Sequence, residues 1–312
     1  MEQIGLLHDG QIYDLQTAEA LNIKGDIIKA DDSKESLEIL RHSCAHMMAQ
    51  AIKELYPEAK FFVGPVVKEG FYYDFKVESK ISDEDLPAIE KKMKEIADRK
   101  LPITRHETTK EEFFEKFKND ELKQAVLKNI KDDTLTIYKQ GDFEDLCRGP
   151  HLPNTRMIRS FKLTRVAGAY LGGDEKNEMI TRIYGIAFFD KQALFDYTKM
   201  IEEAKKRDHR KLGTELELFT FNDDVGAGLP MWLPNGARLR SKLEHLLYKA
   251  HRVRGYEPVR GPEILKAEMW KISGHYANYK ENMYFTTIDE QEYGIKPMNC
   301  VGHIQIFKNS LV

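Results

Sequence analysis

The chain has 312 residues, of which 41% are hydrophobic and 32% charged, and its formal net charge is −3. This length allows an ample core and predicts two domains, while the slight acidity argues against a uniformly basic nucleic-acid binder. No apolar run approaches the roughly 18 residues of a membrane span, and the polar start is not that of a signal peptide. We therefore expect a cytoplasmic protein.

The first thirty residues predict a short strand-rich lead-in, with strands near residues 10–14 and 25–29, too small to be a domain alone. Residues 33–56 then predict a helix that ends at Pro57. Its apolar residues recur every three or four positions and predict one buried stripe; they are Leu37, Leu40, Cys44, Met48, Ala51 and Leu55.

His42 and His46 are four residues apart, so a helix places both side chains on one face. At about 100° per residue this face lies roughly opposite the apolar stripe. The pattern therefore predicts that both histidines line a cleft or face solvent rather than fill the core.

The following segments alternate between strand and helix patterns. Residues 61–67 and 70–75 predict two strands around a turn, and a capped helix begins at Ser82 and Asp85. Short strand-prone pieces recur over residues 134–189. This order predicts an α+β domain over residues 31–189, with helices packed on an antiparallel sheet.

Residues 190–212 predict a charged connecting helix and a domain boundary, and a second domain over residues 213–312. In that domain, residues 226–236 are turn-rich, residues 237–254 predict a long helix, and residues 255–262 predict a strand. The basic run 205–211 fits either a solvated helix end or an RNA contact, and the first interpretation is more common for a charge run.

Two motifs carry most of the chemical information. Residues 42–46 read HSCAH and residues 147–151 read CRGPH, in a chain with only three cysteines and ten histidines. Together they predict one polar site that is assembled from two distant segments and can bind a metal or orient a water molecule. Cys44, Cys147 and Cys300 are too widely separated for a disulfide framework, which favours a reducing compartment.

The sequence resembles the amino-terminal part of the threonyl-tRNA synthetase family over nearly its whole length. The resemblance rests on ordered motifs at residues 42–46, 64–66, 70–74, 147–151, 168–174, 182–185, 208–211, 274–279 and 296–300. It implies an editing domain, shared with alanyl-tRNA synthetases in its histidine and cysteine motifs. An incomplete class II catalytic domain with an antiparallel sheet would follow it.

The resemblance also implies roles for individual residues. Four groups would surround a serine ester at the tRNA end, with three more as supporting groups: His42, His46, Cys147 and His151, then Tyr73, Lys123 and Asp145. Serine and threonine differ by one methyl group, worth only about 1 to 3 kcal/mol of discrimination, so a second hydrolytic sieve has a physical purpose. The first four residues also match tetrahedral zinc ligation. Alanine-specific relatives are expected to bind zinc there, whereas threonine enzymes would use water alone.

For the second domain, the resemblance makes Cys300 a ligand of a catalytic zinc that selects threonine, and Met298 part of the amino-acid pocket. Pro262 matches the class II dimer interface and implies a homodimer. Val301 stands where the family usually has proline. The ATP-binding arginines, two further zinc ligands and the anticodon-binding domain would follow Val312, and the ubiquitin-like amino-terminal domain would be absent or reduced to residues 1–30.

The leading hypothesis is a fragment of a ligase that joins threonine to tRNA(Thr) with ATP, Mg and one zinc per subunit. In this fragment, only the editing site that hydrolyses Ser-tRNA(Thr) would be complete. Two alternatives are a free-standing trans-editing hydrolase and a non-catalytic tRNA-binding module.

Overall fold

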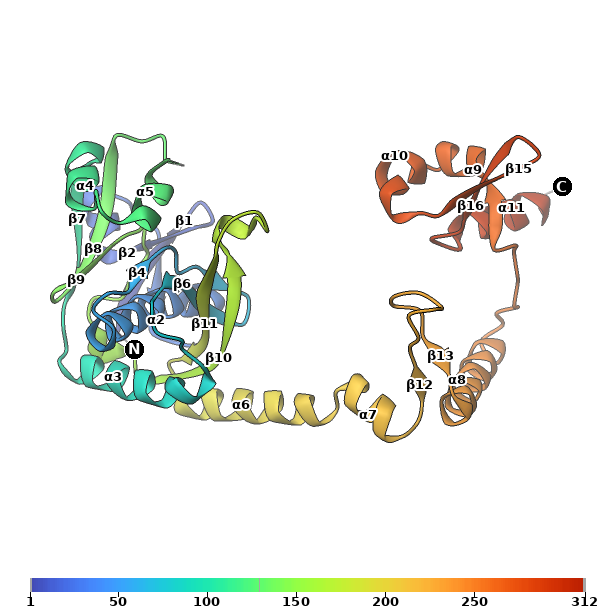
Figure 1. The fold of residues 1–312 in the computed structure, drawn as a ribbon, viewed down its shortest axis with the longest axis horizontal. Helices are drawn as coiled ribbons and strands as arrows, with labels where there is room; N and C mark the ends of the chain where they lie inside the picture. Colours follow the sequence, from blue (N-terminus) through green and yellow to red (C-terminus); the bar gives the residue numbers. More distant parts are fainter. Residues whose placement is uncertain (1, 129, 311–312) are drawn as a thin grey trace. The chain divides into compact units, whose positions relative to one another are not determined.

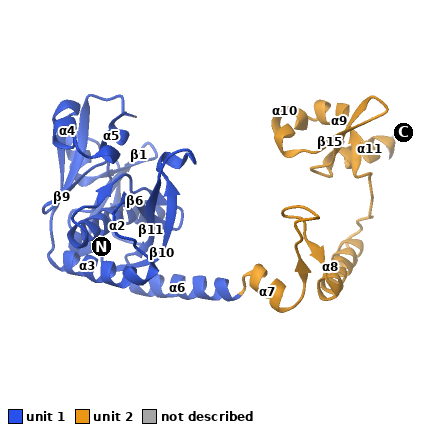
Figure 2. Cartoon of the chain, viewed as in Figure 1, with its two compact units in different colours: residues 1–206 blue, residues 207–312 orange. Residues whose placement is uncertain are grey.

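The structure is a computed structural model that describes residues 2–128 and 130–310, and it divides into two compact units, residues 1–206 and 207–312. Figure 1 shows the fold and Figure 2 colours the two units separately. Both units mix helices with sheets, and all strand pairs described are antiparallel, which confirms the predicted α+β class.

The described residues of unit 1 form three sheets with strand orders β2-β1-β3, β10-β11-β6-β4 with β5 beside β6, and β7-β8-β9. The strands are β1 (Gln3–His8), β2 (Gln11–Asp14), β3 (Asp26–Lys29), β4 (Lys60–Phe61), β5 (Val66–Val67), β6 (Gly70–Lys76), β7 (Ile103–Thr109), β8 (Thr134–Gln140), β9 (Phe143–Leu146), β10 (Ser160–Tyr170) and β11 (Met179–Phe188). The helices are α1 (Leu15–Ala20), α2 (Lys34–Leu55), α3 (Leu86–Asp98), α4 (Lys110–Lys116), α5 (Glu121–Lys128) and α6 (Lys191–Lys206).

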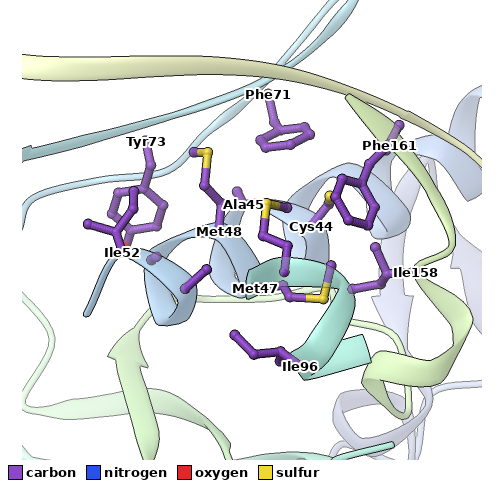
Figure 3. Packing of buried hydrophobic residues seen from close by; sticks show 14 of the residues in the cluster. Cys44, Ala45, Met47, Met48, Ile52, Phe71, Tyr73, Ile96, Ile158 and Phe161 are labelled. Atoms are coloured by element: carbon purple, nitrogen blue, oxygen red, sulfur yellow. The ribbon is translucent and has the colours of Figure 1, made fainter. Parts of the chain in front are cut away.

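Helix α2 is the centre of unit 1, because it contacts α3, β1, β6 and β11. Figure 3 shows Met47 and Met48 on this helix among Phe71, Ile96 and other buried side chains. All four of these residues are completely buried. A helix enclosed on several sides obtains most of its stability from this packing.

The predicted helix over residues 33–56 is confirmed, but the prediction of a single buried stripe is wrong. Burial extends round α2, so Ser43, His46 and Gln50 are buried although they are polar. Leu55, assigned to the stripe, is 37% exposed. The spacing of apolar residues did not predict the burial of α2, because such spacing describes a helix that packs on one side. Helix α2 is covered on several sides.

The lead-in packs against the rest of unit 1 through Ile4, which is fully buried and belongs to the main core. It contains a strand, β1, and a helix, α1, that the sequence patterns did not indicate. The strand predicted over residues 61–67 is interrupted over residues 62–65, between β4 and β5, and this stretch contains Pro65. Proline lacks the N–H that a continuous ladder needs. The cap at Ser82 is confirmed: its backbone N–H donates to Asp85 at 2.8 Å.

Unit 2 contains short strands and five helices in its described residues, 207–310. The strands are β12 (Phe219–Thr220), β13 (Met231–Trp232), β14 (Ile264–Lys266), β15 (Phe285–Ile288) and β16 (Gln291–Ile295). The helices are α7 (His209–Glu215), α8 (Pro234–Arg252), α9 (Ala267–Ile272), α10 (His275–Tyr279) and α11 (Cys300–Ser310).

Three predictions around unit 2 need correction. The helix predicted over residues 190–212 breaks into α6 and α7, because the Asp208 side chain accepts from the Arg210 N–H at 2.8 Å and caps α7. Helix α8 begins earlier than predicted, at Pro234, where proline costs no helical hydrogen bond. Residues 255–262 form no strand, and the ladder starts at Ile264.

The described helices include none that combines the length and the apolar character needed to cross a membrane.

Candidate functional site

The two histidine and cysteine motifs meet inside unit 1. The ligand atoms of four side chains lie within 4.8 Å of one another: those of His42, His46, Cys147 and His151. Helix α2 supplies the first two, and the loop after β9 supplies the others. The ring centroids of His42 and His151 are 4.2 Å apart, and those of His46 and His151 are 4.3 Å apart. The structure therefore brings together all four residues of the predicted group.

Hydrogen bonds fix the orientation of the His151 ring. Its Nδ1 lies 3.2 Å from Ser43 Oγ and its Nε2 lies 3.0 Å from Cys147 Sγ. The hydroxyl of Ser43 donates to the Ile39 carbonyl at 2.9 Å and accepts from the Leu152 N–H at 2.8 Å. Because the single hydroxyl proton of Ser43 is used in the bond to Ile39, Ser43 accepts the hydrogen bond from His151 Nδ1–H. The Nε2 atom of His151 is then unprotonated and is the acceptor that faces the Cys147 thiol.

Burial keeps the site in its neutral protonation state. It lowers the pKa of His42 to about 4, although hydrogen bonding to the backbone at Pro150 raises it. Burial also lowers the pKa values of His46 and His151, and the neighbouring histidines lower them further. The pKa of the Cys147 thiol is raised by burial. Neutral imidazoles beside a neutral thiol can accept a proton, whereas an activated thiolate nucleophile is disfavoured.

A buried ion pair forms a second part of the site. Lys123 of α5 and Tyr73 of β6 both donate hydrogen bonds to the carboxylate of Asp145 on β9. Burial lowers the pKa of Lys123 to about 8 and raises that of Asp145, so desolvation opposes the ion pair that the direct contact favours. Charge on Lys123 also lowers the pKa of His46. The three supporting residues therefore form one network beside the histidines.

Two cavities border the site, one at the Lys123–Asp145 pair and one at Cys147. One of about 500 Å³ is lined by Lys123 and Asp145 together with Phe61 and Phe143. The other, of about 370 Å³, is lined by Cys147, Arg148 and apolar side chains of β8 and β9. The ring centroids of His46 and Phe143 are 6.4 Å apart, and the two rings are arranged edge-to-face. The site therefore combines polar groups with apolar walls and adjacent space, as small-molecule sites usually do.

The donor set fits a zinc ion chemically. Three imidazoles and one cysteine, which would bind as the thiolate, match a tetrahedral site, and the unprotonated Nε2 of His151 could accept the metal. Tetrahedral ligation at normal bond lengths needs donors about 3.3 to 3.6 Å apart, a range compatible with the 4.8 Å limit of this cluster. Both interpretations from the sequence, water alone and zinc, therefore have a physical basis.

The predicted residues of unit 2 lie outside this cluster. Cys300 is exposed at the first turn of α11, and Met298 is 46% exposed just before it. Among described residues, Cys300 joins no group of three potential metal ligands. Pro262 is exposed in the segment before β14, and Val301, in place of the usual proline, is buried in α11.

The basic run 205–211 is exposed and partly neutralised. Lys206 donates to Glu203 at 2.6 Å, Arg210 donates to Asp208 at 2.7 Å, and Lys211 lies 3.8 Å from Glu215. These local pairs favour the interpretation of a solvated helix end.

The sequence patterns did not indicate three residues that contact the site. Ser43 lies inside the HSCAH motif, where the pattern does not distinguish it from its neighbours, and Asp14 and Tyr138 lie outside both motifs. The Asp14 carboxylate accepts from the His151 backbone N–H at 3.0 Å and from the Tyr138 hydroxyl at 2.6 Å. The position of Asp14 before a short helix could have indicated a cap, but no local signal shows a partner 137 residues away.

Comparisons with known proteins agree with the motifs. The family model described as the threonyl and alanyl tRNA synthetase second additional domain matches residues 135–184, which include Cys147 and His151. The threonine-tRNA ligase of Campylobacter jejuni subsp. jejuni serotype O:6 (strain 81116) is 70% identical over 310 residues, 99% of this chain and 51% of that protein. The threonine-tRNA ligase of Helicobacter hepaticus is 67% identical over 309 residues, again 99% and 51%.

A solved structure, the RNA binding domain of threonyl-tRNA synthetase from Cryptosporidium parvum Iowa II, is 47% identical. It covers 33% of this chain and 26% of its own chain, with a TM-score of 0.33. The chain spans about half the length of the curated relatives that it matches. The resemblance to the threonyl-tRNA synthetase family is confirmed, and the residues that the family model matches lie within unit 1.

Proposed function

We propose that this chain, as part of a threonine-tRNA ligase, hydrolyses the ester between serine and tRNA(Thr) at the site in unit 1. One observation carries the proposal: three histidines and a cysteine meet beside a buried lysine and carboxylate, next to two cavities. Ester hydrolysis needs a positioned water, a group that takes its proton, and charge that stabilises the oxyanion.

The residues divide these tasks. His42 and His46 orient the water, and a neutral imidazole accepts its proton as the water oxygen bonds to the ester carbon. The bond to the ribose oxygen then breaks, and the proton passes to that oxygen. Lys123 supplies positive charge near the developing oxyanion, and Asp145, which accepts a hydrogen bond from Tyr73, holds Lys123 in place. Cys147 and His151 complete the wall, because a neutral thiol beside an acceptor nitrogen is a hydrogen-bond donor rather than a nucleophile.

We propose that water alone suffices for this reaction. A zinc ion held by His42, His46, Cys147 and His151 would instead polarise the ester or activate the water. The neutral protonation states that burial imposes already provide an acceptor for the water proton at pH 7, so the residues can perform the step without the metal.

The properties of the whole ligase belong to the same proposal. They are activation of threonine with ATP and Mg, zinc bound through Cys300, a threonine pocket that includes Met298, and a homodimer. tRNA(Thr) would be the common substrate of ligation and editing. Free Cys44, Cys147 and Cys300 suit a reducing, cytoplasmic location.

The experiment compares hydrolysis of serine-charged and threonine-charged tRNA(Thr) by the purified chain, with His46→Ala as the control for contaminating esterases. We expect loss of serine but not threonine, and a fall of at least about 100-fold in the variant. A folded chain that leaves seryl-tRNA intact would contradict the hydrolase. If it still binds tRNA, a non-catalytic binding module is the better description.

A further inference from the structure

The carboxylate of Asp14 is only 2% exposed, and the chemistry above does not use it. It lies at the end of β2, in the lead-in that the sequence patterns predicted to be an appendage. Its Oδ1 accepts from the Thr17 N–H at 2.7 Å and caps α1. Its Oδ2 accepts from the Tyr138 hydroxyl at 2.6 Å and from the His151 backbone N–H at 3.0 Å.

We propose that Asp14 is a positioning residue of the hydrolytic site. The lead-in sheet, which carries Asp14, therefore contributes to that site. Asp14 holds the backbone of residues 149–151 so that the His151 ring stays between Ser43 and Cys147. The inference deepens the proposed function and rests on it.

Capping of α1 alone does not explain why residue 14 is a buried aspartate with both carboxylate oxygens hydrogen-bonded. A helix cap needs one side-chain oxygen, which serine, threonine or asparagine provides as well as aspartate. Here the second oxygen is buried and bonded to a segment 137 residues away in sequence. Burying a charged group is costly unless it is fully hydrogen-bonded, and the three donors to Asp14 meet that requirement.

The loop packs directly on the carboxylate. Gly149 has a φ of +76°, and a Cβ there would lie 2.6 Å from the Tyr138 hydroxyl oxygen and 2.8 Å from Asp14 Oδ2. Contacts this short leave no room for a side chain, so glycine allows the close approach.

Two anchors then hold consecutive backbone groups. Asp14 from the lead-in accepts from the N–H of His151, and Ser43 from α2 accepts from the N–H of Leu152. The same Ser43 oxygen contacts His151 Nδ1. The ring and the backbone of His151 are therefore fixed from both sides, and release of either anchor would let the imidazole leave the other three groups.

The test substitutes Asp14→Asn in the full chain. Asparagine keeps an oxygen for the α1 cap but places an amide NH₂ where Oδ2 was, opposite the His151 N–H. We expect kcat for seryl-tRNA hydrolysis to fall about 10- to 100-fold, the range for outer groups that orient site residues, with KM unchanged. Asp26→Asn, on the exposed strand β3 of the same sheet, should keep the wild-type kcat.

A second readout detects the position of the ring itself. Nitrogen NMR of ¹⁵N-histidine-labelled protein should show His151 with its proton on Nδ1 in the wild type and a mixture of tautomers in Asp14→Asn. If Asp14→Asn does not fold, the variant Gly149→Ala is used in its place for both measurements. It disturbs the packing of the loop on Asp14 without changing a residue of the lead-in.

Loss of kcat together with mixed tautomers supports the proposal. A folded variant with wild-type kcat overturns it, and so does a loss of kcat with an unchanged His151 tautomer. If the wild-type chain hydrolyses no seryl-tRNA, the proposed function fails, and the nitrogen spectra alone decide whether Asp14 positions His151.

Discussion

Helices α2 and α8 are similar in length, 22 and 19 residues, but their surroundings are opposite. Most residues of α2 are buried, including polar ones, whereas Gly236 is the only buried residue of α8. The apolar residues of α8 recur along one face and are 46 to 61% exposed: Leu239, Leu243, Leu246 and Leu247. Amphipathic spacing therefore does not determine how much of a helix is buried.

The difference explains where chemistry can occur. On α2, the His46 ring lies against Tyr73 of β6 and Phe143 of β9, the His42 ring lies against His151 in the loop after β9, and burial lowers the pKa values of both histidines. His245 on α8 is exposed and belongs to no such cluster. A site that must hold a water and an ester in place needs the first kind of environment.

The largest expected contrast concerns buried and exposed lysines. Lys123→Ala leaves the Asp145 carboxylate buried without its cation, which should lower the free energy of unfolding of unit 1 by about 3 to 5 kcal/mol. Lys242→Ala on α8 should change it by less than about 0.5 kcal/mol. Urea unfolding followed by far-UV circular dichroism measures both. Equal losses of unfolding free energy in the two variants would show that the buried Lys123–Asp145 pair stabilises the chain no more than an exposed lysine does.

A matched pair of apolar substitutions tests packing directly. Met47→Ala removes a fully buried side chain from the core and should cost about 2 to 5 kcal/mol. Leu246→Ala removes a side chain that is 61% exposed and should cost less than about 0.5 kcal/mol. The same urea titration distinguishes them. A large loss at Leu246 would mean that α8 is covered in solution.

Acid should destabilise unit 1 selectively. The pKa of His42 is about 4 in the folded chain and about 6.5 when unfolded, and burial lowers the pKa values of His46 and His151 as well. The unfolded state therefore binds more protons below pH 6.5, and stability falls as the pH falls. From pH 7.0 to 6.0 the loss should be about 0.7 kcal/mol per histidine, roughly 2 kcal/mol in all.

Both tryptophans of the chain, Trp232 and Trp270, lie in unit 2, so their fluorescence serves as the control for this titration. The thermal midpoint of unit 1, measured by circular dichroism, should fall between pH 7.0 and 6.0 while tryptophan emission stays constant. A constant midpoint would contradict burial of the three histidines in their neutral form.

The smallest expected effect is that of metal removal. Because neutral histidines supply the proton acceptor, dialysis against a chelator should leave seryl-tRNA hydrolysis unchanged. Activity that disappears with chelator and returns with zinc would assign the cluster at His42, His46, Cys147 and His151 to the metal instead.

Sequence patterns predicted what is local in unit 1. The α2 helix and the Ser82 cap depend on residues within a few positions of one another, and both were correct. The burial of His46 could not be predicted, because it depends on strands and loops that close over α2 from elsewhere in the chain. The resemblance to a family brought the two motifs together, but the contact of Asp14 with His151 appears only in three dimensions.

If unit 1 contains the whole proposed hydrolytic site, residues 1–206 should be active without unit 2. The most direct test compares seryl-tRNA(Thr) hydrolysis by residues 1–206 and by the full chain at saturating substrate, with folding of both verified by circular dichroism. We expect the same kcat for both, because His42, His46, Cys147, His151 and their anchors lie within unit 1. A folded but inactive 1–206 fragment beside an active full chain would contradict it.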